Sequence, residues 1–542
     1  MDSLKRVDAW FSTRNAAIFI GVCLLALAWW NRFLQDDAFI SFRYAQHLTE
    51  GHGLVWNVGE PQPVEGYSNF LWVVLIAAGM LLGIEPEIWS MLLGFGAAVC
   101  TLVVTYRLVR QMTESNGFAL LAVFLLGTNY SFSAYVTGGL ETQLQVLFVV
   151  LSYFLALQIH ENAWYQRHDV LIALSLILAF AVMTRLDSVL LVGPAWLWVA
   201  WTVWKQGGAR RSAVMALVMP GLLLGIAWFT FKWVYYGEIL PNTAYVKITG
   251  YSLKTLKAGI WFVWSFLMNY SLLIGPLLWL FSLPRLLSDP LLRLLAGVCV
   301  LWSVYLIKIG GGFMEFRLMM PILPLILVLT VAALHSVRSR RLVAATASLM
   351  VLSSIAHAVT FQVERNIESI DDLHAHVSEV GPDWGWHRIG QLLHESFGDA
   401  ELPVVIATTA AGAIPYYSGL PTVDMLGLND HWVARHGQRI DALAGHSRYA
   451  TLDYLLTQGV NLVVGHPKVL PIASTRRYGA QQMFLTTYFD GPFDISDFPD
   501  EARVIEMPIS DRYKVVMLYL RPHPEIDRVI REQRLAVYIP AR

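Results

Sequence analysis

Residues 15–46 read NAAIFIGVCLLALAWWNRFLQDDAFISFRYAQ, a long apolar run followed at once by two adjacent aspartates. A helix needs about 20 apolar residues to cross about 30 Å of hydrocarbon, so residues 15–33 predict a membrane span. Basic residues before the run fit a signal anchor or a cleaved signal. We favour the anchor, because Trp29 and Trp30 stand where interfacial aromatic residues are expected. The stretch therefore places two carboxylates, Asp36 and Asp37, at a membrane edge.

The composition of the chain agrees with a polytopic membrane protein. Of its 542 residues, 56% are hydrophobic and 15% are charged, which is far from the balance of a soluble domain. The net charge is −1, and the sequence has neither a Lys/Arg-rich block nor a glycine-rich phosphate loop, so we expect no nucleic-acid partner. The three cysteines lie inside apolar runs, which excludes a disulfide framework and zinc spacing.

We predict about eleven transmembrane helices in a domain of residues 1–360. Besides residues 15–33, the runs lie near 88–108, 117–136, 143–160, 170–184, 189–204, 213–234, 264–283, 292–308, 319–335 and 342–360. Residues 70–84 are equally apolar but number only 15 and end at Glu85-Pro86-Glu87. This segment should lie along the membrane interface or dip into it, among the juxtamembrane helices of the first outer loop.

Charge supports this topology. With a cytoplasmic N-terminus, the inner loops hold 14 basic residues and the outer loops 9, the C-terminal tail excluded. The bias follows the positive-inside rule. Basic residues kept on the outer side favour an anionic ligand there, although snorkelling and local ion pairs explain part of the set.

Residues 361–542 form a second predicted domain. They are rich in charge, Pro and Gly and contain no run long enough to cross a membrane. The segment LPVVIATTAAGAIPYYSGLPTVDMLGLND (402–430) alternates strand-like and helix-like patterns, and NLVVGH (461–466) reads as a later strand. We expect an α/β fold on the outer side.

The predicted outer loops gather most of the polar residues near the membrane. Any single cluster is explained by helix caps and turns, but together they predict one site. The residues concerned are Asp36, Asp37, Arg43, Tyr44, Glu65 and Tyr67 in the first loop, Glu141 in TGGLETQ, Arg185 and Asp187 in TRLDS, Asn242, Tyr245 and Lys247 in YYGEILPNTAYVK, and Glu315 and Arg317 in KIGGGFMEFRLMMP.

The chemistry of these residues favours sugar transfer from a lipid phosphate. Neighbours on a helix point about 100° apart, so one of Asp36 and Asp37 would be the general base and the other its support. A phosphate leaving group needs cations such as Arg317 or Lys247 rather than a general acid. The triple glycine beside Arg317 would let a substrate approach the backbone closely.

The motifs DDAFISFRYAQHLTEGHGLVWNVGEPQPVEGYSNFLW (36–72), TGGLETQ, TRLDS and GEILPNTAYVK resemble the GT-C superfamily of polytopic glycosyltransferases. Within it they look most like the mycobacterial terminal arabinofuranosyltransferases and the bacterial pilin arabinosyltransferases. The resemblance implies a decaprenyl-phosphate arabinofuranose donor, Asp36 or Asp37 as the catalytic carboxylate, Glu141 and Asp187 in the sugar pocket, and Lys247 and Arg317 at the phosphate. Gly312 stands where the family pattern has an acid, which leaves open whether Glu315 substitutes for it.

We therefore expect an enzyme of the bacterial inner (cytoplasmic) membrane whose active site and C-terminal domain face the periplasm. It would transfer a sugar to a glycan, lipid or pilin acceptor, and D-arabinofuranose is the sugar that we favour. Another pentose, aminoarabinose or a hexose, moved to lipid A or a surface polysaccharide, is the second enzymatic reading. A polyprenyl-lipid transporter or flippase is the rival from another class. A monophosphate donor does not require a metal, but the acids leave a divalent cation, Mg or Ca, open.

Overall fold

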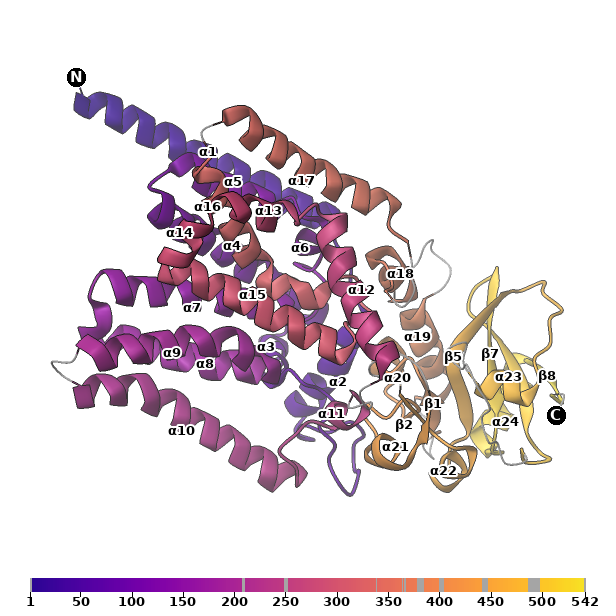
Figure 1. The fold of residues 1–542 in the computed structure, drawn as a ribbon. Helices are drawn as coiled ribbons and strands as arrows, with labels where there is room; N and C mark the ends of the chain where they lie inside the picture. Colours follow the sequence, from indigo (N-terminus) through magenta and orange to yellow (C-terminus); the bar gives the residue numbers. More distant parts are fainter. Residues whose placement is uncertain are drawn as a thin grey trace.

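A computed structural model describes residues 2–206, 210–247, 252–337, 339–362, 364, 367–377, 385–398, 404–440, 447–485 and 498–540, without the side chains of residues 2–14, 206, 210 and 247. A helical bundle forms one end of the molecule, and a mixed sheet with its own helices forms the other (Figure 1). The N-terminus lies at the far end of the bundle and the C-terminus beyond the sheet.

The bundle follows the apolar runs of the sequence closely. Its main helices are α1 (Asp2–Trp30), α4 (Pro86–Thr113), α5 (Asn116–Gly127), α6 (Tyr130–Ala134), α7 (Thr142–Glu161), α8 (His168–Thr184), α9 (Val189–Gln206), α10 (Arg210–Tyr236), α12 (Leu253–Asn269), α13 (Ile274–Phe281), α15 (Pro290–Ile309), α16 (Leu323–His335) and α17 (Arg340–Thr360). Shorter pieces complete it: η1 (Trp164–Gln166), η2 (Leu186–Ser188), α14 (Leu283–Ser288) and η3 (Arg317–Ile322).

In the described part of the chain, seven helices are long and apolar enough to cross a membrane, and the bent pair α12–α13 makes an eighth. Three other predicted spans coincide with shorter apolar helices, within α1, α5 and α8. The protein is therefore a multi-pass membrane protein, and eleven crossings stay a prediction.

Two predicted spans are not continuous helices. The run 117–136 is divided into α5 and α6, because the Asn129 side chain accepts a hydrogen bond from Phe132 N and starts a new helix. The run 264–283 is bent by 78° between α12 and α13, where Ser271 has a φ of 53°. The hydrophobicity of the sequence predicts neither break, because both lie within apolar runs.

The first outer loop forms two helices, α2 (Asp36–Thr49) and α3 (Phe70–Leu81). With 12 residues, α3 is too short to cross about 30 Å of hydrocarbon. It packs on α2 and α4. The short helix α11 (Asn242–Lys247) follows α10 and contacts α21 (His431–His436).

The sheet contains six strands in the order β2-β1-β5-β7-β6-β8. Its strands are β1 (Ile406–Thr408), β2 (Thr422–Asp424), β5 (Leu462–Pro471), β6 (Arg503–Pro508), β7 (Tyr513–Tyr519) and β8 (Ala536–Tyr538), and a separate hairpin pairs β3 (Gln438–Arg439) with β4 (Arg448–Tyr449). The strands β2, β1 and β5 are parallel, whereas β5-β7, β7-β6 and β6-β8 are antiparallel.

Alternate residues of the strands face two cores. On β7, Val515 and Met517 belong to the large cluster that also runs through the helical bundle, whereas Val516 and Leu518 belong to a second cluster. This is the two-residue period of a strand buried on both faces. One hydrophobic core therefore continues from the membrane helices into the sheet region.

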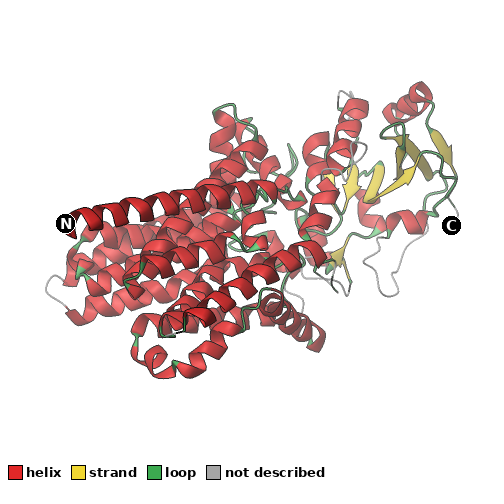
Figure 2. Ribbon diagram, turned by 90° about the horizontal axis from the view of Figure 1, so that it is seen from above, coloured by secondary structure: helices red, strands yellow, loops and turns green. Residues whose placement is uncertain are grey.

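Several helices surround the sheet: α18 (Ile370–Val377), α19 (Trp386–Phe397), α20 (Ala413–Ser418), α22 (Leu452–Thr457), α23 (Ala480–Phe484) and α24 (Pro524–Gln533). Of these, α18, α19 and α20 lie between the bundle and the strands (Figure 1). The helices of the bundle run toward the strands in the perpendicular view as well (Figure 2).

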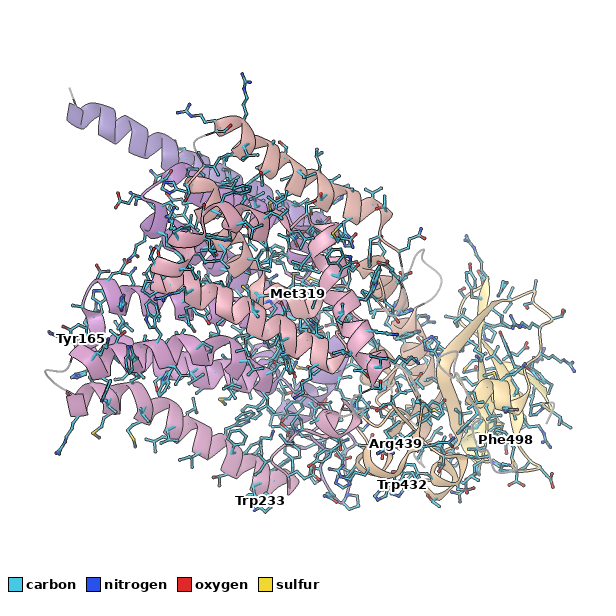
Figure 3. All side chains as sticks on the ribbon, viewed as in Figure 1. Tyr165, Trp233, Met319, Trp432, Arg439 and Phe498 are labelled. Atoms are coloured by element: carbon cyan, nitrogen blue, oxygen red, sulfur yellow. The ribbon has the colours of Figure 1, made fainter. Side chains whose placement is uncertain are left out.

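The two ends of the bundle differ in what they meet. Tyr165, between α7 and α8, lies at the end far from the strands, whereas Trp233 on α10 lies at the end near them (Figure 3). Met319, which is fully buried, lies in the middle of the helices. The predicted outer loops all belong to the end that meets the α/β region.

Candidate functional site

A cavity of about 370 Å³ opens at this junction. Its walls come from the start of α2, from η2, from the segment before α11, from the end of α15 and from the first loops of the α/β region. Five residues predicted from the sequence line it, namely Asp36, Asp37, Arg185, Asp187 and Arg317. Asp36 and Arg317, which are 281 positions apart in the sequence, thus line the same hollow.

Asp36 is held by the α/β region. Its Oδ2 accepts the backbone N–H of Gly412 at 3.1 Å, and its Oδ1 accepts that of Ala413 at 2.7 Å. Burial raises the pKa of Asp36 to about 7; the two backbone hydrogen bonds oppose the shift and the charge of Asp37 adds to it. A carboxyl with this pKa is partly ionised at neutral pH, which suits a general base.

Asp37 is the next residue on the first turn of α2 and lines the same cavity. Successive side chains on a helix diverge by about 100°, so the two carboxylates approach the cavity from different directions. Asp36 therefore has an orientation fixed by two amides, and Asp37 supplies a second negative charge beside it.

The cavity lining also includes two arginines that form ion pairs with acids. Arg185 forms a bidentate pair with Asp187, with N–O distances of 3.1 and 2.8 Å, and Tyr305 donates to Asp187 Oδ2 at 3.3 Å. Arg317 contacts Glu141 at 2.6 Å and donates to Thr142 Oγ1 at 3.0 Å. The acids hold both guanidinium groups at the cavity wall.

Glu141 joins the two arginines. Its Oε1 lies 3.3 Å from Arg185 NH1 as well as 2.6 Å from Arg317 NH2, and its Oε2 accepts from Asn69 at 2.9 Å. Burial opposes ionisation, but the two guanidinium groups lower the pKa of Glu141 below its usual value. Glu141 is 1% exposed and does not line this cavity, so its place in the sugar pocket stays a prediction.

The triple glycine closes the cavity next to Arg317. Gly310 and Gly311 have φ angles of 88° and 78°, and Gly311 and Gly312 line the cavity. A Cβ on Gly311 would lie 2.6 Å from the Phe262 side chain. The positive φ and the contact with Phe262 both require glycine at Gly311. The close approach of a substrate to this backbone stays a prediction.

Four predicted residues of the first loop form contacts within the protein and do not line the cavity. Arg43 bonds Trp56 O at 2.9 Å, Leu420 O at 3.0 Å and also Pro415 O. The other three are equally occupied: Tyr44 donates to Val64 O, Tyr67 bonds Tyr236, and Glu65 pairs with Lys232 at 2.9 Å. None of these four residues lines this cavity, because all four are buried in contacts within the protein. Their contact with substrate stays a prediction.

The predicted residues of α11 also bind the protein itself. Asn242 donates to Gly427 O at 2.8 Å and accepts from Arg435 at 2.8 Å, and the Arg435 guanidinium lies 4.1 Å from the centre of the Tyr245 ring. Asn242 and Tyr245 therefore connect α11 to Arg435 of α21, and neither lines the cavity. Their role in substrate binding stays a prediction. The side chain of Lys247 lies outside the described residues.

Glu315 is likewise buried away from the cavity. It contacts His357 at 2.9 Å, accepts from Ile370 N at 2.9 Å and accepts from Ser131 at 3.1 Å. These bonds join the segment before η3 to α6, α17 and α18. Whether Glu315 replaces the acid that Gly312 lacks stays open.

Other cavity residues were not predicted from the sequence. Tyr305 lies within the apolar run of α15, where nothing marks it as different from a core aromatic residue. Thr409 and Ala411 come from the first loop of the sheet region, and Ser68 and Thr243 from the outer loops. The run TTAAG before α20 was the available signal for the sheet residues.

The described part of the chain contains no cluster of side chains suited to bind a metal ion. No group of three or more His, Cys, Asp or Glu there could hold an ion. Asp36 and Asp37 are two carboxylates, which is fewer protein ligands than Ca²⁺ usually takes.

Comparison with known proteins gives three results. Residues 373–519 match a family described only as a domain of unknown function, DUF8728. The chain is 25% identical over 360 residues to the terminal β-(1→2)-arabinofuranosyltransferase of Mycobacterium tuberculosis, covering 58% of this chain and 54% of that protein. It is 24% identical over 370 residues to the protein of the same name from Corynebacterium glutamicum, covering 60% and 52%. The chain thus spans about half the length of these relatives.

The fold also matches solved structures. ArnT from Cupriavidus metallidurans bound to undecaprenyl phosphate matches with a TM-score of 0.56 and 14% identity, covering 94% of this chain and 98% of ArnT. Its apo form matches with the same TM-score, 12% identity, and 93% and 98% coverage. The sequence resemblance to arabinofuranosyltransferases that the loop motifs predicted is therefore confirmed. The chain is a multi-pass membrane protein that shares the fold of ArnT.

Proposed function

We propose that this chain is a membrane glycosyltransferase that moves a sugar, D-arabinofuranose, from a polyprenyl phosphate to an acceptor outside the cytoplasmic membrane. The observation that carries the proposal is the cavity itself, because Asp36 and Asp37 line the same hollow as Arg185 and Arg317. The printed names of the two relatives support the sugar, and the lipid bound to ArnT supports a polyprenyl carrier.

In the proposed reaction, an acceptor hydroxyl attacks the anomeric carbon of the donor. The new bond joins that carbon to the acceptor oxygen, the bond between the carbon and the phosphate oxygen breaks, and polyprenyl phosphate leaves with the electron pair. Asp36 takes the hydroxyl proton, because its pKa of about 7 leaves it partly ionised and two amides fix its direction. Each of its oxygens keeps a lone pair for this proton.

The phosphate would lie against Arg185 and Arg317. Arg185 donates three of its five N–H groups to Asp187 and Glu141, and Arg317 donates three of its five to Thr142, Glu141 and Met314 Sδ. N–H donors therefore remain for phosphate oxygens. Because Glu141 and Asp187 hold the arginines before substrate binds, little reorganisation accompanies charge build-up on the leaving group. The apolar cavity residues Ile309, Met314 and Leu318 would meet the first isoprene units.

The decisive experiment measures sugar transfer by the purified protein. Polyprenyl-phosphate arabinofuranose and a soluble arabinofuranoside acceptor are supplied, and release of polyprenyl phosphate is followed with and without a chelator, Mg²⁺ or Ca²⁺. Wild type should release it, and Asp36→Asn should reduce the rate at least about a hundredfold. Asp453→Asn, at an exposed position on α22, is the control and should leave the rate unchanged.

Other outcomes would overturn parts of the proposal. Transfer from a polyprenyl phosphate carrying aminoarabinose, another pentose or a hexose, in preference to arabinofuranose, would replace the donor sugar. Movement of the donor across a vesicle membrane without release of polyprenyl phosphate would favour a flippase. Full activity in both Asp36→Asn and Asp37→Asn would remove the aspartate pair from the chemistry.

A further inference from the structure

A second, smaller cavity of about 60 Å³ lies on another side of the aspartate pair. It shares five lining residues with the first cavity: Asp36, Asp37, Phe313, Thr409 and Leu426. The two hollows therefore meet at the carboxylates. Any group in the second cavity would approach Asp36 and Asp37 from a direction that the donor does not occupy.

The second cavity has walls of its own from the α/β region. His376 of α18 stacks on Trp386 of α19, with ring centres 4.7 Å apart and planes at 5°. His466 of β5 meets Trp386 edge-on at 5.6 Å and 88°. Glu368 and Gln35 complete the polar part of the lining.

Two polar atoms at this cavity have no partner in the protein. Gln35 Oε1 and Thr409 Oγ1 form no hydrogen bond, although Gln35 is 1% and Thr409 9% exposed. Buried polar atoms are nearly always satisfied, so such orphans indicate a missing partner. Gln35 Oε1 needs a donor, and Thr409 can either donate or accept. A hydroxyl-bearing ligand supplies both kinds of group.

The charge of the lining residues and the volume of the second cavity limit the kind of ligand that it can bind. Asp36, Asp37 and Glu368 are acidic, and the described lining includes no Arg or Lys, so an anionic group is disfavoured. One water needs about 10–15 Å³, so the cavity has room for about four to six water-sized groups. That space fits the hydroxyl edge of one sugar ring rather than a lipid.

We propose that this second cavity, which we name the acceptor pocket (Gln35, Glu368, His376, Trp386, Thr409 and His466), binds the terminal ring of a neutral sugar acceptor. The inference rests on the proposed transfer reaction. The reacting hydroxyl would face the aspartate pair, while neighbouring hydroxyls satisfy Gln35 and Thr409. The α/β region thus selects the acceptor, and the membrane helices hold the donor.

The test separates acceptor binding from donor chemistry. Gln35→Met removes the side-chain amide that lacks a partner, with little change of shape. His466→Phe removes the polar imidazole nitrogens from the lining of the acceptor pocket. Neither residue lines the first, larger cavity, in which the donor is proposed to bind. For each variant, the KM for an alkyl arabinofuranoside and the rate of donor hydrolysis by water are measured. We expect the acceptor KM to rise about tenfold, the effect of losing about one hydrogen bond, with donor hydrolysis changed less than about twofold.

Gln143→Met is the matched control. Gln143 Oε1 is also buried and unpartnered, but Gln143 lines neither cavity, so its acceptor KM should stay at the wild-type value. An unchanged KM in both Gln35→Met and His466→Phe, with wild-type melting temperatures, would overturn the acceptor pocket and show that it holds only water. Failure of the proposed function differs, because wild type would then transfer no sugar and hydrolyse no donor.

Discussion

Gly412 donates its backbone N–H to the side chain of Asp36, although the two residues are 376 positions apart in the sequence. The contact is so close that a Cβ on Gly412 would lie 1.9 Å from the Asp36 carbonyl oxygen. The candidate base is thus positioned jointly by a membrane-edge helix and by the α/β region. Neither part would orient the carboxylate alone.

Gly412→Ala should break the contact between Asp36 of α2 and the loop before α20. The added methyl group has no room, so the loop before α20 must shift and the amides of Gly412 and Ala413 must leave Asp36. We expect sugar transfer to fall at least about tenfold, as for other small displacements of a catalytic group. Gly297→Ala on α15, where a Cβ meets nothing within 4 Å, should keep the wild-type rate. Equal rates in the two variants would contradict the positioning role.

The pH dependence of transfer should report Asp36. Because its pKa is raised to about 7, mainly by burial, the carboxyl accepts no proton once protonated, and the rate should fall about tenfold per pH unit below about pH 7. In Asp37→Asn the neighbouring charge is absent, so the pKa of Asp36 and the acid limb of the residual activity should move to lower pH. If the acid limb of the pH–rate profile stays at the same pH in Asp37→Asn, the limb reports a group other than Asp36.

The same shift has a consequence for stability. The folded pKa of Asp36 lies above its usual value of 3.8, so the folded state binds more protons than the unfolded state between these pH values. Stability contributed by this group should therefore decrease as pH rises from about 4 to about 7. Melting temperatures of wild type and Asp36→Asn across this range measure the difference.

Arg317→Gln should weaken binding of the lipid phosphate. The substitution removes a cation at the cavity wall but keeps a polar side chain of similar reach. We expect the Kd for polyprenyl phosphate, measured by titration calorimetry in detergent, to rise at least about tenfold. Arg388→Gln on the exposed face of α19 is the control. An unchanged Kd in Arg317→Gln would remove this residue from the phosphate site.

Glu141→Gln should destabilise the protein more than a surface substitution does. It would leave the partly buried guanidinium groups of Arg185 and Arg317 without their shared, buried carboxylate, a loss of up to about 3–5 kcal/mol by comparison with buried pairs. Glu395→Gln breaks the exposed pair with Arg388 and should cost less than about 1 kcal/mol. Denaturation of both variants in detergent tests the contrast. Similar losses would mean that Glu141 is not the anchor of the two arginines.

Cysteine labelling should establish the orientation in the membrane. In a background without Cys23, Cys100 and Cys299, Glu501→Cys in the α/β region should react with an impermeant maleimide on intact cells whose outer barrier has been removed. Asp169→Cys, at the other end of the bundle, should react only after permeabilisation. Both positions are exposed. The reverse pattern would place the candidate site in the cytoplasm.

The sequence by itself determined the membrane architecture and the general location of the site. Apolar runs separate helices from loops because burial in lipid requires long hydrophobic segments, and charge and polarity marked which loops carry chemistry. It therefore predicted Asp36, Asp37, Arg185, Asp187 and Arg317, all of which line the first cavity, of about 370 Å³. It also predicted the helical bundle followed by an α/β region.

Only the tertiary structure decided which polar residues face the cavity and which hold the protein together. Arg43, Glu65, Glu141, Asn242 and Glu315 are of the same chemical types as the cavity residues, and their roles differ because each is buried against a partner far away in the chain. Composition and local spacing contain no information about such partners. The direction of a side chain is set by packing between elements, and that packing exists only after the chain has folded.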